Sequence, residues 1–176
     1  MQERGSKLGI TQEVVDGTLK KVEPHANTMD IYVRSVIFRM SQEQPLLAAF
    51  LQKIEIDGNV SNVLVYNLGA TLTYDMLTQS FTGEKRKRQI TPELLGVVIQ
   101  NFKDHFVKTG FNMTWFNDKL QEDSPAFKKL LDDFVFGLED NNAKSDFTLG
   151  AYLVAMPFYM MAEAEELEQS IFGIDQ

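Results

Sequence analysis

The sequence of 176 residues contains no cysteine and only two histidines, His25 and His105. The lack of cysteine excludes disulfide bonds, thiolate catalysis, thiolate zinc sites and iron–sulfur clusters, and it fits a reducing compartment. We therefore expect a cytoplasmic protein. Neither histidine lies in a His-Glu-x-x-His or Glu-x-x-His pattern, so the common zinc-protease and carboxylate di-iron motifs are also excluded.

Long apolar runs are also scarce. The uncharged stretch 147–162 has 16 residues and includes Tyr152, Pro157 and Tyr159. A helix that spans a membrane needs roughly 20 apolar residues, so we expect a buried core helix and no membrane span. The first residues are polar and no apolar stretch with a cleavage site follows them, so no secretory signal is expected.

Basic residues are few in the second half of the chain. The net charge is −8, and residues 1–90 hold eleven Lys and Arg against ten Asp and Glu, whereas residues 91–176 hold six against fifteen. A chain with this balance is not expected to bind nucleic acid over a broad basic face. The acidity of the second half is explained by solubility.

What the sequence has in abundance is apolar residues at intervals of three and four, the period of an amphipathic helix. Thr11, Pro45, Thr91-Pro92 and Ser124-Pro125 supply the capping residues and first-turn prolines that begin helices. We predict an all-α bundle of about eight helices, one domain over residues 1–176, with residues 1–10 as a flexible N-terminal segment. The expected helices are 11–22, 28–40, 45–57, 59–82, 91–108, 112–120, 124–138 and 147–171, with a polar loop at 139–146 and a bend in the last helix at Pro157.

Residues 59–82 leave an alternative open. Val63–Tyr66 and Ala70–Tyr74 are rich in residues that favour strands, and Asn67-Leu68-Gly69 between them would suit a hairpin turn. Helical spacing of the apolar residues favours a helix instead.

No catalytic signature is present. The sequence lacks a Gly-x-Ser-x-Gly elbow, a Ser-x-x-Lys pair and glycine-rich phosphate-binding motifs. Its carboxylates flank loops or lie on polar helix faces, where they are expected to be solvated and not paired for acid–base chemistry. Residues 140–146 are rich in oxygen ligands but lack the glycine and terminal glutamate of an EF-hand. We therefore expect a protein that is not an enzyme and has no metal site and no cofactor.

Two charged segments are candidate interaction surfaces. The first is the basic run Lys85, Arg86, Lys87 and Arg88, which could take a phosphate, an acidic partner or an anionic membrane surface, or could be a solvated loop. The second combines Glu163, Glu165 and Glu166 with the apolar Phe172. On this basis we predict a regulatory or adaptor protein that acts by protein–protein interaction or self-association.

A cluster of aromatic and methionine residues surrounds Pro157 and is a candidate pocket for an apolar small molecule, although such residues also simply fill cores. Its members are Met156, Phe158, Tyr159, Met160 and Met161.

The order of elements over residues 28–170 resembles the globin family. The resemblance rests on about eight helices, a third helix that begins with Pro45, and His105 near a helix end before Gly110 and Trp115. It implies a sensor or carrier in which His105 would be the proximal ligand of haem iron. A globin-like fold that holds a lipid-like molecule without iron is the other form of this alternative.

Overall fold

The computed structural model describes residues 9–22, 29–58, 60–80, 88–104 and 114–172, with the side chains of Phe102, Trp115 and residues 164–172 left aside. This part of the chain is helical, with eight α-helices and no strand, which confirms the predicted all-α fold. The helices are α1 (Gln12–Val22), α2 (Met29–Glu43), α3 (Pro45–Ile56), α4 (Val63–Ser80), α6 (Pro92–Phe102), α7 (Thr114–Asp123), α8 (Pro125–Phe136) and α9 (Asn141–Phe172).

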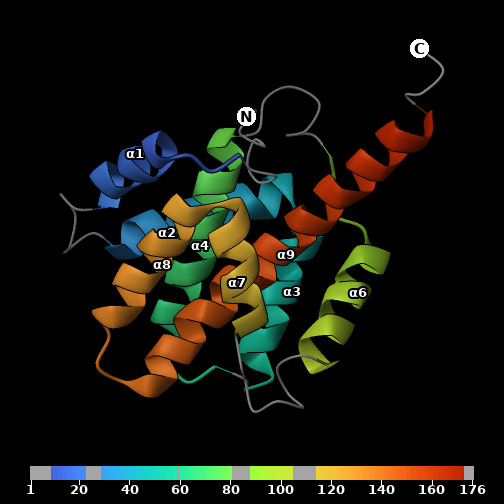
Figure 1. Cartoon of the computed structure of the whole chain (residues 1–176). Coiled ribbons are helices and arrows are strands. Elements are labelled where there is room, and N and C mark those ends of the chain that lie inside the picture. The colour runs from blue at the N-terminus through green and yellow to red at the C-terminus, as the bar shows by residue number, and fades with distance from the viewer. Residues whose placement is uncertain (1–8, 23–28, 59, 81–87, 105–113, 173–176) are drawn as a thin grey trace.

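Helices α4 and α9 form the centre of the bundle and share its most extensive contact (Figure 1). They approach closely because Gly69 of α4 and Gly150 of α9 lie at their crossing. A Cβ atom on Gly69 would lie 2.2 Å from the carbonyl oxygen of Phe147, and one on Gly150 would lie 2.2 Å from that of Tyr66. Only glycine therefore permits this separation of the two backbones.

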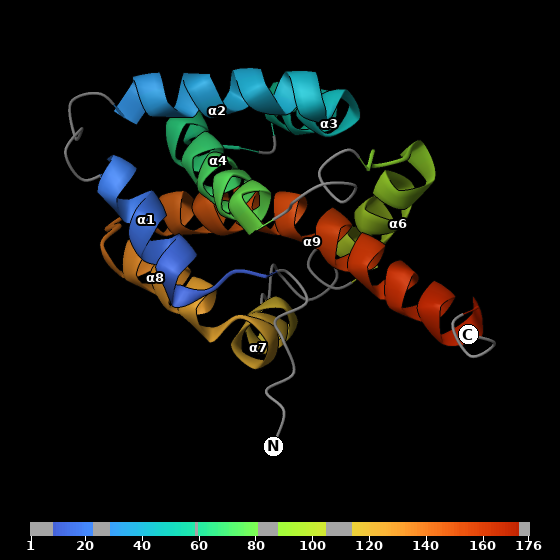
Figure 2. The same cartoon turned by 90° about the horizontal axis from the view of Figure 1, so that it is seen from above.

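The other helices cover the central pair from two sides. Figure 2 shows α2 and α3 in a row on one side of α4 and α9, with α7 and α8 on the other. Helix α1 packs on α4 and α8 at one end, and α6 packs on α9. The C-terminal half of α9 extends beyond the bundle, and its direction differs from that of the first half in Figure 2, as expected for a helix that contains Pro157.

Residues 63–80 form the single helix α4, so the predicted helix is confirmed and the hairpin alternative is wrong. Its residues from Leu68 to Thr78 are all buried, because α4 is enclosed by neighbouring helices. A helix that is buried on every side lacks the clear alternation of exposed polar and buried apolar residues by which a sequence separates helix from strand. This burial explains the ambiguity of residues 59–82.

The predicted polar loop at 139–146 is wrong over most of its length, because α9 begins at Asn141. The Asp140 side chain accepts a hydrogen bond from the backbone N–H of Asn142 at 2.9 Å and so caps the helix. Asp146 is buried and accepts hydrogen bonds from the backbone N–H groups of Ser61 at 3.1 Å and Asn62 at 2.6 Å. The side chains of Asp140 and Asp146 thus accept hydrogen bonds from backbone N–H groups at the starts of α9 and α4.

Several local signals are confirmed. The hydroxyl of Thr91 accepts a hydrogen bond from the backbone N–H of Leu94 at 3.2 Å, and Pro92 follows at the first position of α6. Pro45 and Pro125 begin α3 and α8, and Gly58, with a φ of 78°, follows the end of α3. Ile10, which the sequence places in the N-terminal segment, is buried.

Candidate functional site

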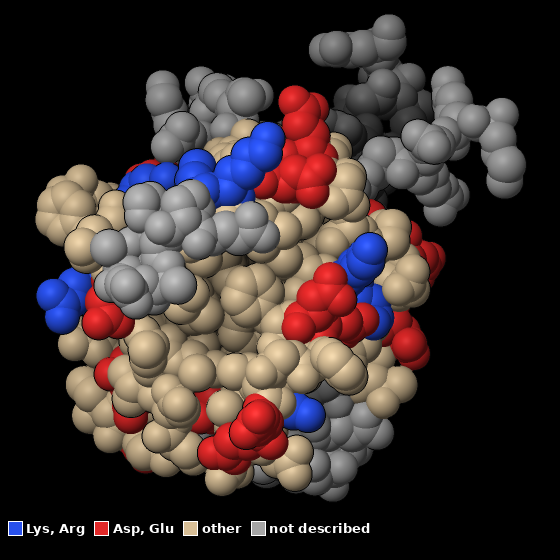
Figure 3. Space-filling model, turned by 90° about the vertical axis from the view of Figure 1, so that its left-hand side faces the viewer, with Lys and Arg blue, Asp and Glu red and all other residues tan. Residues whose placement is uncertain are grey.

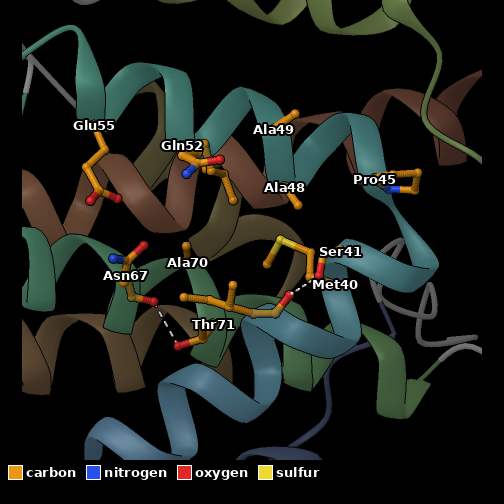
Figure 4. Close-up of a pocket in the computed structure, with 12 residues that line it drawn as sticks. Met40, Ser41, Pro45, Ala48, Ala49, Gln52, Glu55, Asn67, Ala70 and Thr71 are labelled. Atoms are coloured by element: carbon orange, nitrogen blue, oxygen red, sulfur yellow. Dashed lines mark hydrogen bonds between the residues drawn. The ribbon is translucent and has the colours of Figure 1, made fainter.

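A groove of about 570 Å³ runs between α2, α3 and α4. Figure 4 shows side chains from all three helices along it. The apolar side chains that line it are Ile37, Met40, Pro45, Ala48, Ala49, Leu51 and Ala70. The polar ones are Ser41, Gln52, Glu55, Asn67 and Thr71. We call this hollow the α2–α3–α4 groove.

Small residues keep the groove open. Ser41, Ala48, Ala49 and Ala70 have side chains too short to fill the space between three helices. Leu47 and Leu51 are the buried residues of α3, and of the two only Leu51 contributes to the lining of the groove. Helix α3 is therefore attached by one narrow stripe and presents much of its remaining surface to the groove and to solvent.

The groove has a polar end and an apolar end. Figure 4 places Glu55, Gln52 and Asn67 together at one end and Pro45 at the other. Within the part of the chain that the structure describes, none of the side chains of Glu55, Gln52 and Asn67 makes a hydrogen bond or an ion pair. The polar end can therefore accept or donate hydrogen bonds to a bound group.

Exposed apolar side chains continue the groove past its polar end. Ile56 is 73% exposed and lies one turn after Gln52 on α3, whereas Leu64 is 46% exposed and lies one turn before Asn67 on α4. Of the eight large apolar side chains that are exposed in the described part of the chain, six belong to these three helices. They are Ile31, Phe38, Leu46, Ile56, Val63 and Leu64.

A buried ionic cluster holds α2 against α4 beside the groove. The Asp75 carboxylate accepts hydrogen bonds from the Tyr32 hydroxyl and from Nη2 of Arg39, each at 2.9 Å, and Nζ of Lys21 lies 3.5 Å away. Burial alone would raise the pKa of Asp75, but the bonds from Arg39 and Tyr32 and the charge of Lys21 outweigh burial and lower the pKa. Asp75 is thus ionised and joins α1, α2 and α4.

One face of the molecule carries charged side chains of both signs. Figure 3 shows the left-hand side of the view in Figure 1: Lys and Arg gather along its upper edge next to Asp and Glu, and its middle is largely uncharged. On this face no large area carries a single sign of charge.

The segment Arg88–Ile90 is fixed at the apolar end of the groove. The buried Gln44, just before Pro45, donates from Nε2 to the backbone oxygen of Arg88 at 2.8 Å and accepts from the backbone N–H of Ile90 at 3.0 Å. The side chain of Gln89 donates to the backbone oxygen of Glu43 at 2.8 Å. Arg88 is exposed, so the last residue of the basic run lies beside the N-terminal end of α3.

The predicted apolar pocket residues lie apart from the groove. Met156, Phe158 and Tyr159 are buried in the core, and Met160 and Met161 are partly buried against it. The hydroxyl of Tyr159 donates to Asp123 at 2.9 Å. None of these five residues lines the α2–α3–α4 groove or the second described hollow, which lies beside α1.

The other predicted site residues are scattered or not described. Glu163 is exposed and pairs with Lys119 at 2.8 Å. Glu165, Glu166 and Phe172 belong to α9, but their side chains are not described. His105, Lys85, Arg86 and Lys87 lie outside the described residues, so the haem ligand and most of the basic run stay predictions.

Sequence reasoning missed the groove, although one signal pointed to it. The segment 45–56 carries apolar residues on more sides than a single buried stripe requires. Leu46 and Ile56 are the residues left over once Leu47 and Leu51 are buried. A surplus of this kind on a surface helix is typical of an interaction surface.

No group of three or more His, Asp or Glu side chains gathers as a metal site would within the residues that the structure describes. Among the described helices, none combines the length and apolar character that crossing a membrane requires. No protein-family model, curated protein or solved structure matches the chain.

Proposed function

We propose that this protein is a regulatory or adaptor protein without enzymatic activity, which binds another protein through the α2–α3–α4 groove. The observation that carries this proposal is the concentration of exposed apolar side chains on the helices that form the groove. Exposed apolar surface is costly in water, and contiguous patches of it are typical of interaction sites. The absence of cysteine supports a cytoplasmic location.

The groove has the dimensions for a short helix. Its α3 wall has 12 residues from Pro45 to Ile56, which is about 17 Å at the rise of an α-helix. A partner helix of about three turns would lay apolar residues at positions i, i+3, i+4 and i+7 along this wall. The amides of Gln52 and Asn67 would bind polar groups at its end.

The chemistry of the groove supports binding over catalysis. Its lining contains one titratable side chain, Glu55. General acid–base catalysis usually pairs two groups whose pKa values are driven apart, and the lining offers no second group. An apolar small molecule is the alternative occupant, because cavities of this volume also hold small ligands. The groove is partly open to solvent, however, so a segment of another protein can enter it from the surface.

The experiment is a selection of displayed peptides of about 12 residues against the purified protein. Ala49→Glu places a charged side chain in the groove at an exposed position and serves in a counter-selection. Gln121→Glu, at an exposed position of α7, is the matched control. We expect enriched amphipathic peptides that bind the wild type and Gln121→Glu equally and bind Ala49→Glu at least about tenfold more weakly.

A selection that enriches no peptide able to distinguish the wild type from Ala49→Glu would refute binding of a helix in the groove. Capture of an apolar small molecule alone, detected by native mass spectrometry and lost in Ala49→Glu, would favour the carrier alternative.

A further inference from the structure

We propose that the partner of the α2–α3–α4 groove is an amphipathic helix of another protein that carries a lysine or an arginine opposite Glu55. This inference rests on the proposed function, because it names the chemistry of the partner that the same groove binds. It is carried by the described charges in and around the groove, which leave one carboxylate of the lining without a balancing cation.

Glu55 is the one charged side chain among the residues that line the groove. It is partly buried, and Figure 4 shows it directed from α3 toward Asn67 of α4. Within the described part of the chain its carboxylate forms no ion pair, and its polar neighbours in the lining are the amides of Gln52 and Asn67. A carboxylate in this position loses water when a partner covers it, so binding favours a partner that brings a compensating cation.

A second carboxylate adds to the negative charge at this end of the groove. The Tyr66 hydroxyl donates to the backbone oxygen of Leu51 at 2.9 Å, one turn before Glu55. Burial raises the pKa of Tyr66 most, and the charges of Glu55 and Asp146 raise it further, so both carboxylates act on this hydroxyl. Asp146 is buried and already accepts two backbone hydrogen bonds, so Glu55 is the carboxylate that a partner can reach.

The basic side chains of the three helices do not neutralise Glu55. They are Arg34, Arg39 and Lys53, and none of them lines the groove. Arg39 belongs to the buried ionic cluster, and in the described part of the chain neither Arg34 nor Lys53 lies within ion-pair distance of Glu55. Lys53 is two residues from Glu55 and therefore about 200° around α3, on the face that it shares with the acidic Asp57.

The opposite end of the groove has no comparable carboxylate in its lining. Glu43 lies 3.6 Å from Arg39, and the exposed Arg88 carries the opposite charge beside the start of α3. Neither Glu43 nor Arg88 lines the groove. A partner helix would therefore meet apolar side chains over most of its length and a negative charge at one end.

The apolar surroundings of Glu55 suit the side chain that would reach it. Ile56 is exposed next to Glu55, and Leu64 is exposed one turn before Asn67. Lysine and arginine can lay their aliphatic stems along such apolar surface while their charged ends reach the carboxylate. The hydrogen bond formed there joins two ionised groups, which makes it stronger than a neutral one.

The test extends the selection of displayed peptides of about 12 residues to variants of Glu55. On the wild type, we expect enriched peptides to carry lysine or arginine at one fixed position relative to their apolar stripe. On Glu55→Lys, the same library should yield aspartate or glutamate at that position. Two synthetic peptides, with lysine or glutamate there, are then titrated against both proteins by fluorescence anisotropy. Each should bind the protein of opposite charge at least about tenfold more tightly than the other protein.

Glu55→Gln removes the charge while nearly keeping the shape of the side chain. Glu122→Gln, at an exposed position of α7, is the matched control. The lysine peptide should bind Glu55→Gln about tenfold more weakly than it binds the wild type, and it should bind Glu122→Gln and the wild type equally. Higher salt should weaken its binding to the wild type more than to Glu55→Gln, because salt screens the charge pair. Circular dichroism of each variant separates loss of binding from loss of folding.

Three results would overturn the inference: enriched peptides without a preferred basic position, a Glu55→Gln variant that binds the lysine peptide as tightly as the wild type, or a glutamate peptide that gains nothing from Glu55→Lys. Native mass spectrometry that shows a dimer or a bound apolar molecule, lost in Ala49→Glu, would assign the groove to a second copy or a small ligand instead. The proposed function survives loss of the charge preference alone if the selected peptides still bind the wild type and not Ala49→Glu. If no peptide makes that distinction, both proposals are refuted.

Discussion

The close crossing of α4 and α9 predicts that replacing glycine with alanine destabilises the protein at the crossing and stabilises it at glycines elsewhere. Alanine at Gly69 or Gly150 would place a Cβ atom 2.2 Å from a backbone carbonyl oxygen of the facing helix. Alanine at Gly96, inside α6, or at Gly17, inside α1, would meet no atom within 4 Å. The change in chemistry is the same in all four cases, so only the contact differs.

The size of the effect follows from two contributions. Alanine in place of glycine inside a helix stabilises it by roughly 0.5–1 kcal/mol. At Gly69 and Gly150 an ordinary contact of about 3.4 Å requires the two backbones to separate by about 1 Å, and overpacking of a core costs roughly 1–3 kcal/mol or more. We therefore expect a net loss of about 2 kcal/mol at Gly69 and Gly150, and a gain below about 1 kcal/mol at Gly96 and Gly17.

Thermal and urea unfolding followed by circular dichroism measure these changes. For a chain of this length, about 2 kcal/mol lowers the Tm by roughly 4–8 °C, and the gain at Gly96 raises it by a few degrees at most. If Gly69→Ala and Gly150→Ala were as stable as Gly96→Ala, the close approach of α4 and α9 would be wrong.

Three further predictions concern buried polar groups. Asp75→Asn should lower the free energy of unfolding by about 2 kcal/mol in urea titrations, because it removes the charge that balances Arg39. The pKa of Asp75 is lower in the folded state than in the unfolded state, where it is about 4. The stability that the Asp75 charge contributes is therefore complete well above about pH 4 and is lost as the pH falls through the pKa of the folded state. The difference in stability between the wild type and Asp75→Asn should shrink over that lower pH range. Asp146→Ala leaves two backbone N–H groups at the start of α4 without their acceptor and should cost about 1–2 kcal/mol in the same assay; an unchanged midpoint would contradict this role. Burial raises the pKa of Tyr66 and Tyr152, so stability should fall as the pH rises above about 10, and tyrosinate absorbance should increase together with loss of helical circular dichroism, not before it.

Helix positions were largely predictable because their signals are local. Thr91-Pro92 and Pro125 begin helices in the structure as in the sequence, since capping and the fixed φ of proline depend on a few neighbouring residues. The start of α9 was not predictable in this way. Asp146 has no local reason to be helical and buried, and its role becomes visible only when Ser61 and Asn62 lie beside it.

The candidate site was less predictable than the fold. Sequence density of methionine and aromatic residues directed attention to Met156–Met161, but Met156, Phe158 and Tyr159 pack in the core, as large apolar residues in a central helix do. Half of the residues that line the groove are alanines or small polar residues, which carry little sequence signal. Its position depends on how far apart three helices lie, and that distance is not encoded in any one of them.

The sequence by itself determined the helical class, the approximate limits of most helices and the uneven charge, because periodicity, capping and composition act over a few residues. Tertiary structure decided which apolar surfaces are covered and which stay exposed. Leu51 and Ile56 belong to the same apolar helix, yet one is buried and the other is exposed. The difference arises because α3 rests on its neighbours along one stripe, and packing between distant segments alone selects that stripe.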